Sequence, residues 1–75
     1  MQILSIERPT NSRNPIYHGI AVSTRGVRYE WFREARSRRL LGAFRLYPPD
    51  ASGRILFHDV KPPAALKRAV LAALA

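Results

Sequence analysis

The sequence predicts an α+β fold: an antiparallel β-meander of four to five strands, followed by one C-terminal helix packed on the sheet. Short segments that alternate apolar and polar residues are separated by turn-forming residues through most of the chain, which is typical of paired strands. A proline pair at 62–63 then precedes apolar residues that recur at helical spacing. With 75 residues, the chain is expected to form a single small domain.

Turn-forming residues mark where the expected elements begin and end. The strands are predicted at about residues 2–7, 16–23, 27–36, 39–47 and 54–58, and the helix at about 62–74. Residues 8–15 form a loop that contains two prolines. Gly26 can adopt a positive φ and close a three-residue hairpin with a bulge, whereas Ser37 and Arg38 suit a tighter turn.

The first hairpin turn determines which residues of the second and third strands lie opposite each other. If Ser23 faces Val27, then Gly19 lies opposite Trp31, so a residue without a side chain meets a large ring. Complementary sizes of this kind are expected on a packed face of a sheet.

The second hairpin turn extends the same pairing to the fourth strand. If Arg36 faces Arg39, then Trp31 lies opposite Phe44, and Glu30 lies opposite Arg45. One face is then nearly all apolar and forms the expected core: Gly19, Ala21, Val27, Tyr29, Trp31, Leu40, Gly42, Phe44 and Leu46. The reverse face carries the charges: Arg28, Glu30, Glu34, Arg36 and Arg45.

A helix over residues 28–47 is the alternative for this part of the chain, because Glu, Ala, Arg and Leu are good helix formers. The apolar stripe of that helix includes Arg36, and Gly42 falls in its interior. The hairpin separates apolar from charged residues better than the helix does.

The charge of the chain suggests an anionic ligand. Thirteen basic residues against five acidic ones give a net charge of +8, which favours association with polyanions. Eleven of the basic residues are arginine, and ten residues of the chain are alanine. Codon bias in a GC-rich genome produces the same composition, so both explanations of the arginine excess stay open.

Nucleic-acid binding, or binding of another polyanion, is the first functional expectation. Seven arginines lie between residues 25 and 45, and such a cluster can neutralise phosphate groups. An aromatic ring beside guanidinium groups can also stack on unpaired bases. The residues expected to contact DNA or RNA are Arg28, Arg36, Arg38, Arg39, Arg45 and Tyr47.

The alternative is a protein-interaction or dimerisation module without a nucleic-acid role. Apolar residues share the predicted charged face with the arginines, and an apolar patch on a solvent face usually marks a partner surface. The expected interface residues are Ile16, Ile20, Val22 and Phe32.

Catalysis has little support in the sequence. His18 and His58, with Glu30 or Glu34, could in principle act as acid and base on RNA, so a small ribonuclease or toxin is a third hypothesis. Metal-ligand spacings, a glycine-rich phosphate loop and a nucleophile motif are all missing from the sequence. We therefore expect a protein that is not an enzyme and that needs no metal or cofactor.

The chain has no cysteine, so disulfides cannot stabilise it, and a domain of this size buries only about 60% of its unfolded surface. A homodimer or another protein partner is expected for this reason. The first residues lack the basic and apolar regions of a signal peptide. No apolar run approaches the ~20 residues of a membrane span. The expected location is therefore the cytoplasm, without membrane contact.

Overall fold

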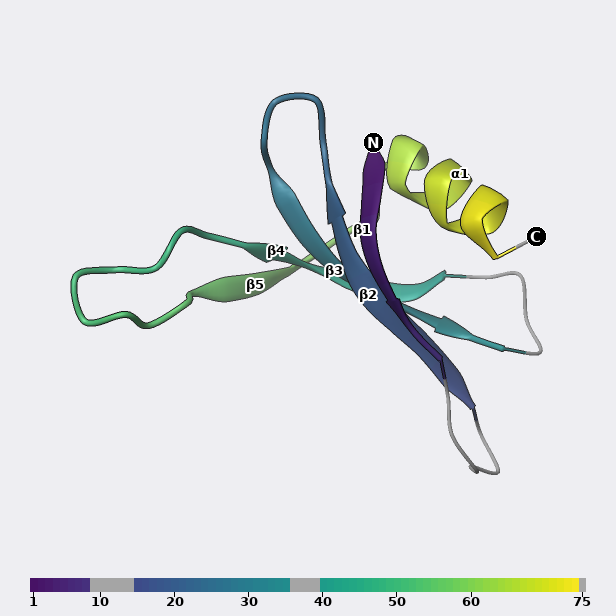
Figure 1. Ribbon diagram of the computed structural model, residues 1–75, viewed down its shortest axis with the longest axis horizontal. Coiled ribbons are helices and arrows are strands. Elements are labelled where there is room, and N and C mark those ends of the chain that lie inside the picture. The colour runs from purple at the N-terminus through teal and green to yellow at the C-terminus, as the bar shows by residue number, and fades with distance from the viewer. Residues whose placement is uncertain (9–14, 36–39, 75) are drawn as a thin grey trace.

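A computed structural model gives the structure of residues 1–8, 15–35 and 40–74. Five strands form one antiparallel sheet in sequential order, and one helix follows them (Figure 1). The elements are β1 (Gln2–Glu7), β2 (Ile16–Val22), β3 (Arg28–Glu34), β4 (Leu40–Leu46), β5 (Phe57–Val60) and α1 (Ala64–Ala73). This confirms the predicted meander and C-terminal helix, and the alternative helix over residues 28–47 is wrong.

The β2–β3 hairpin has the predicted register. Gly26 adopts a φ of 83°, and the Ser23 amide donates to the Val27 carbonyl at 2.9 Å. The Val27 amide in turn donates to the Ser23 hydroxyl at 3.1 Å. Gly19 consequently lies opposite Trp31, as the turn chemistry predicts.

From Gly42 to Leu46, the register predicted for β3 and β4 is wrong by one residue. Trp31 lies opposite Ala43 rather than Phe44, and Arg45 lies opposite Tyr29 rather than Glu30. The pairing also shifts between Phe32 and Arg33. Phe32 lies opposite Gly42 and Arg33 lies opposite Leu40, so Leu41 of β4 has no partner position in β3. Because side chains alternate between the faces of a strand, a slip of one residue moves positions 42–46 of β4 to the other face.

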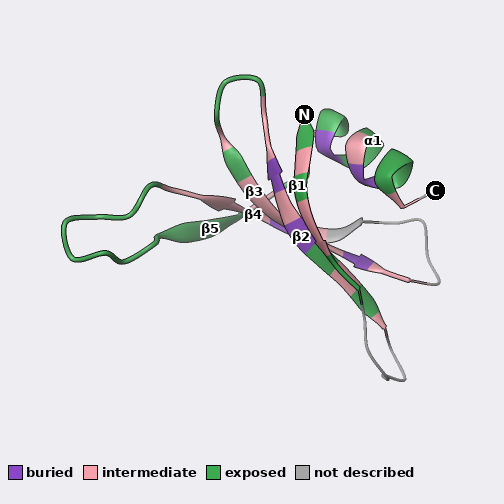
Figure 2. Ribbon diagram, viewed as in Figure 1, coloured by how far each residue is buried: buried purple, intermediate pink, exposed green. Residues whose placement is uncertain are grey.

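The hydrophobic core lies between one face of the sheet and α1. Its buried apolar residues, among those described, are Ala21, Trp31, Ala43, Leu66 and Val70. The two α1 members of this set are four residues apart, so they occupy one side of the helix and turn towards the sheet (Figure 2). Since β4 is shifted, Phe44 and Leu46 do not belong to this core, which corrects the predicted core face.

Gly19 is required where β1 and β2 pass beneath the Trp31 ring. A Cβ atom at this position would fall on the Ser5 carbonyl oxygen of β1 and would lie 2.8 Å from Cζ2 of Trp31. Trp31 itself is fully buried. The absence of a side chain at Gly19 therefore allows the tryptophan to occupy the centre of the core.

The connection between β4 and β5 extends beyond the sheet as a long exposed arm (Figures 1 and 2). It is held by backbone bonds from Tyr47 to Leu56 and from Asp50 to Arg54, each 2.9 Å long. The last strand therefore begins at Phe57 and continues to Val60, later than the predicted strand at 54–58, because residues 54–56 belong to the arm.

The tip of the arm is organised by the Asp50 carboxylate. One of its oxygens accepts hydrogen bonds from the Ser52 hydroxyl at 2.6 Å, the Ser52 amide at 2.9 Å and the Arg54 amide at 3.0 Å. The bond from the Ser52 hydroxyl is the main reason why the pKa of Asp50 lies below its ordinary value, and the Arg54 amide adds to the effect.

Candidate functional site

The sheet face opposite α1, called here the open face, carries an aromatic row that crosses four strands. The row consists of His18, Phe32, Phe44 and Phe57, one residue each from β2, β3, β4 and β5. The ring centroids are 6.2 Å apart for His18 and Phe32, which are stacked. Phe32 and Phe44 (5.6 Å) and then Phe44 and Phe57 (5.4 Å) meet edge to face. These are the geometries that aromatic pairs prefer.

The register explains how the row forms. His18 lies directly opposite Phe32, whereas Phe32 lies opposite Gly42. Because Gly42 has no side chain, nothing on β4 blocks the diagonal contact from Phe32 to Phe44. Phe44 then makes a second diagonal contact, with Phe57 of β5.

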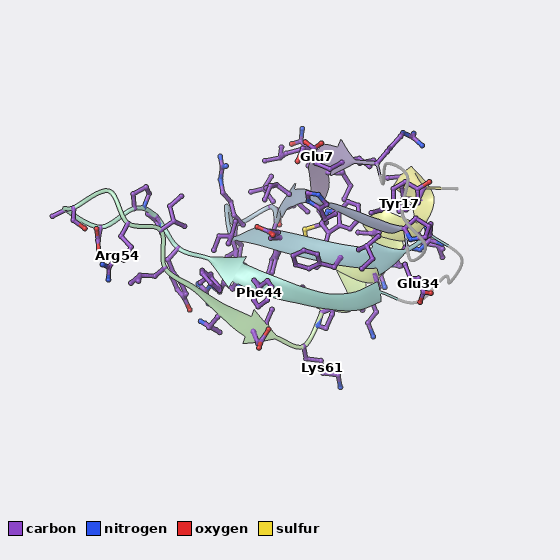
Figure 3. The ribbon with its side chains drawn as sticks, turned by 90° about the horizontal axis from the view of Figure 1, so that it is seen from below. Glu7, Tyr17, Glu34, Phe44, Arg54 and Lys61 are labelled. Atoms are coloured by element: carbon purple, nitrogen blue, oxygen red, sulfur yellow. The ribbon has the colours of Figure 1, made fainter. Side chains whose placement is uncertain are left out.

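The aromatic row is accessible to solvent along most of its length. Phe57 is 62% exposed, and Phe32 and Phe44 are half-buried. A hollow of about 320 Å³ is lined by Glu30, Phe44, Leu46 and Phe57. In Figure 3 the sheet lies in front of α1, and Phe44 is seen near the middle of the sheet.

Other apolar side chains extend the aromatic row into a patch. Ile16, Ile20 and Val22 project from β2 to the open face, and Ile16 is 40% exposed. The predicted interface residues therefore lie on one face together with Phe32, and their role as an interface stays a prediction. His18, Phe44, Leu46 and Phe57 are not among the predicted interface residues, and the wrong β4 register assigned Phe44 and Leu46 to the core.

The open face also holds most of the acidic residues of the chain. Its members by register are Glu7, Glu30, Glu34 and Asp59. Only Asp50, in the arm, lies elsewhere. Arg28 and Glu34 stand at opposite ends of β3 on this face. The open face is therefore acidic and aromatic although the chain as a whole is strongly basic.

The opposite face of β4 and β5 carries a small basic cluster of Arg45, Tyr47 and His58. The Arg45 guanidinium carbon lies 4.9 Å from the centroid of the Tyr47 ring, within the range of a cation–π interaction. The Tyr47 hydroxyl is 3.0 Å from Nδ1 of His58, which lies directly opposite Arg45. His58 was not among the predicted binding residues, because only the β4–β5 register brings it to this cluster.

The described residues predicted to contact nucleic acid are divided between the two faces of the sheet, although Arg28 and Tyr47 both line a hollow of about 410 Å³. Arg28 lies on the open face, whereas Arg45 and Tyr47 lie on the opposite face, which corrects the predicted charged face. Three further members of the predicted set lie outside the described residues: Arg36, Arg38 and Arg39. A contact of these residues with nucleic acid stays a prediction.

Arg33, another arginine of the predicted basic segment, is buried on the α1 side of the sheet with only 8% of its surface exposed. Its Nε atom and the indole Nε1 of Trp31 have no hydrogen-bond partner within the described residues. Arg33 therefore does not contribute to an exposed basic surface.

The two histidines are on different faces, since His18 stacks with Phe32 on the open face and His58 joins Tyr47 on the other. An acid–base pair built from both histidines is therefore not assembled. Within residues 1–8, 15–35 and 40–74, no group of three or more potential metal ligands comes together.

No protein-family model matches the sequence, and comparison with curated proteins and with solved structures gives no significant match. In the described part of the chain, no helix is long and apolar enough to cross a membrane.

Proposed function

We propose that this protein is a small protein-interaction module that binds its partner through the open face. The aromatic row carries the proposal. Antiparallel sheets with one face in water normally present polar residues there, but this face presents a histidine and three phenylalanines in continuous contact. Apolar surfaces of this kind on small proteins usually mark interaction sites, and aromatic residues are enriched in them.

The thin core supports the same proposal. The buried apolar side chains of the described residues form a single layer between α1 and the sheet, and two of them are alanines. Stable domains bury the apolar surface of a sheet in packed layers. A partner on the open face would supply the second layer, and a half-exposed phenylalanine such as Phe57 contributes about 1–2 kcal/mol when it is covered.

A photo-crosslinking amino acid placed at Phe44 tests the proposal in the cells from which the protein comes. The matched control carries the same amino acid at Leu71, which is 45% exposed on α1 and lies away from the open face. We expect discrete crosslinked products from position 44 and none above background from position 71. Equal or absent crosslinking at the two positions would contradict an interaction role for the open face.

Binding of nucleic acid or another polyanion is a second candidate function, and the basic cluster favours it. Four of the five acidic residues lie on the open face, so the opposite side of the molecule has little to offset its arginines and lysines. Arg45 can neutralise a phosphate group, and the adjoining Tyr47 ring offers a stacking surface for a base.

Fluorescence anisotropy with a labelled single-stranded oligonucleotide tests this second candidate over a range of salt concentrations. Arg45→Ala is expected to weaken binding and to reduce the dependence of log K on log salt by about 0.7, the value for one phosphate contact on a single strand. Arg25→Ala removes the same charge from the β2–β3 turn and is the control. Equal effects of the two variants would show that only net charge matters and would contradict a site at Arg45.

A further inference from the structure

We infer that the partner on the open face is a second copy of this chain, packed face to face about a twofold axis with its strands antiparallel to those of the first. This inference rests on the proposed function and names the partner. The resulting dimer is a β-sandwich whose two open faces pack against each other, with α1 on the outside of each sheet.

The charges on β3 select this arrangement. Arg28 and Glu34 project to the open face from opposite ends of the strand, about 20 Å apart at a rise of about 3.3 Å per residue. A twofold axis that crosses β3 at Trp31, perpendicular to the strand and within the interface, places Arg28 opposite Glu34 of the partner subunit. Because the axis is twofold, the ion pair between Arg28 and Glu34 of the partner subunit occurs twice in the dimer.

The other face-to-face arrangement has its axis parallel to β3. It brings Arg28 onto Arg28 of the partner subunit and Glu34 onto Glu34 of the partner subunit. Like charges that face each other across an interface oppose binding. The antiparallel arrangement is therefore the one that the β3 charges favour.

Complementary sizes and charges recur on the next two strands. Phe44 and Gly42 lie at equal distances on either side of the same axis, so the rotation places the Phe44 ring over Gly42 of the partner subunit. No atom lies within 4 Å of the Cβ position at Gly42, which leaves room for the ring. On β5 the same rotation brings Asp59 towards Lys61 of the partner subunit.

Long-range electrostatics also favour contact through this face. Two chains of charge +8 repel each other, and the repulsion is smallest where acidic residues gather. The open face is that surface, since it holds four of the five acidic residues. Arg28 then pairs with Glu34 of the partner subunit, and Asp59 pairs with Lys61 of the partner subunit. These pairs offset part of the negative charge that the two open faces bring together.

The open face approaches the area of a standard dimer interface. Five strands at about 4.8 Å spacing and at most seven residues at about 3.3 Å limit the sheet to roughly 24 by 23 Å, or about 550 Å² in projection, since β1 has six residues and β5 has four. Projecting side chains enlarge this area. A standard interface needs about 800 Å² per partner, which is roughly one-seventh of the 5652 Å² surface of the chain.

Sedimentation equilibrium of the purified full chain at low salt tests the inference with a charge-exchange series. We expect the wild-type chain to be a dimer. Arg28→Glu is expected to weaken the dimer about tenfold or more, because it turns two ion pairs into two contacts between like charges. Adding Glu34→Arg to Arg28→Glu is expected to restore the wild-type affinity.

The restoration is specific to the dimer, because Arg28 and Glu34 are too far apart to pair within one chain. Arg25→Glu is the matched control: it changes the net charge as Arg28→Glu does, but on an exposed turn outside the open face, so the dimer should persist. Thermal unfolding of each variant verifies that it is folded. If Arg28→Glu fails to fold, Glu34→Arg alone and the double variant provide the same comparison.

A wild-type monomer, a double variant as weak as the single one, or an equal loss with Arg25→Glu would each overturn the inference. The crosslinker at Phe44 distinguishes a failure of the dimer from a failure of the proposed interaction role of the open face. Crosslinks to a different protein, together with a monomeric wild-type chain, would overturn the second copy and leave the proposed function standing. A monomeric chain without crosslinks would overturn both.

Discussion

Replacing Gly19 by alanine is expected to destabilise the protein strongly through a single added methyl group. The new Cβ would fall on the Ser5 carbonyl oxygen and would lie 2.8 Å from Cζ2 of Trp31. Neither neighbour can move freely. The first belongs to the backbone of β1, and the second is fully buried against the other core residues. The β1 strand would have to separate from β2, or the tryptophan would have to leave its place.

The magnitude follows from these two contacts. Overpacking a well-packed core costs about 1–3 kcal/mol, and displacing β1 adds the loss of part of its strand pairing. We therefore expect a loss of about 3–4 kcal/mol. A domain of 75 residues has a total stability of about 4–11 kcal/mol, so the variant loses a large part of it. The midpoint of thermal unfolding should fall by more than about 10 °C.

Urea unfolding followed by the fluorescence of the single tryptophan, Trp31, measures this loss. Gly42→Ala is the control on the neighbouring part of the sheet, because no atom lies within 4 Å of its Cβ position. It should leave stability unchanged or raise it by about 0.5–1 kcal/mol, since alanine restricts the unfolded chain more than glycine does. Both variants are made with Arg28→Glu, so that self-association does not contribute to the measured stability.

A Gly19→Ala variant within about 0.5 kcal/mol of its reference would refute this reasoning. An equal loss from Gly42→Ala would refute it as well, because the cost would then not arise from the contacts at Gly19.

Two further predictions concern the helix and the arm. Leu66→Ala should cost about 2–5 kcal/mol in thermal or urea unfolding, because it leaves a cavity at a fully buried position, whereas Leu71→Ala on the exposed side of α1 should change stability by less than about 0.5 kcal/mol. Similar costs for the two would contradict the assigned orientation of α1. Asp50→Ala should speed hydrogen exchange of the Ser52 and Arg54 amides while the melting temperature stays nearly unchanged. Because folding lowers the pKa of Asp50, its carboxylate stabilises the arm fully at a pH above the unfolded pKa near 3.8. This stabilisation is lost as the pH falls through the lower pKa of the folded protein. Exchange that is insensitive both to the substitution and to acid would argue against this turn.

Local turn chemistry predicted the β2–β3 register correctly but not the β3–β4 register, and the turn predicted at Ser37 and Arg38 lies outside the described residues. Gly26 closes the β2–β3 turn by itself, so the pairing of Gly19 with Trp31 could be derived from nearby residues alone. The β3–β4 pairing depends on an extra residue in β4, next to the position where Phe32 lies opposite Gly42. No turn-forming residue in the sequence indicates that extra residue. The resulting slip exchanged the faces of Phe44 and Arg45 relative to the prediction.

The candidate site could likewise be predicted only in part from the sequence. The apolar β2 residues and Phe32 could be grouped from the sequence, because the β2–β3 register was right. The aromatic row and the basic cluster could not be foreseen, since both need the true β4 register and the β4–β5 pairing. His58 and Phe57 acquire their partners only through that pairing.

The sequence by itself determined the order of the elements, the approximate position of each strand and the C-terminal helix. These depend on residue periodicity, glycine and proline, which act over a few positions along the chain. Only the tertiary structure decided which β4 and β5 side chains share a face with those of β2 and β3, because that depends on where β4 takes up its extra residue. Burial of Ala43 beneath α1, rather than of the larger Phe44, is the packing observed, and it places the phenylalanine on the open face, where we expect the partner to bind.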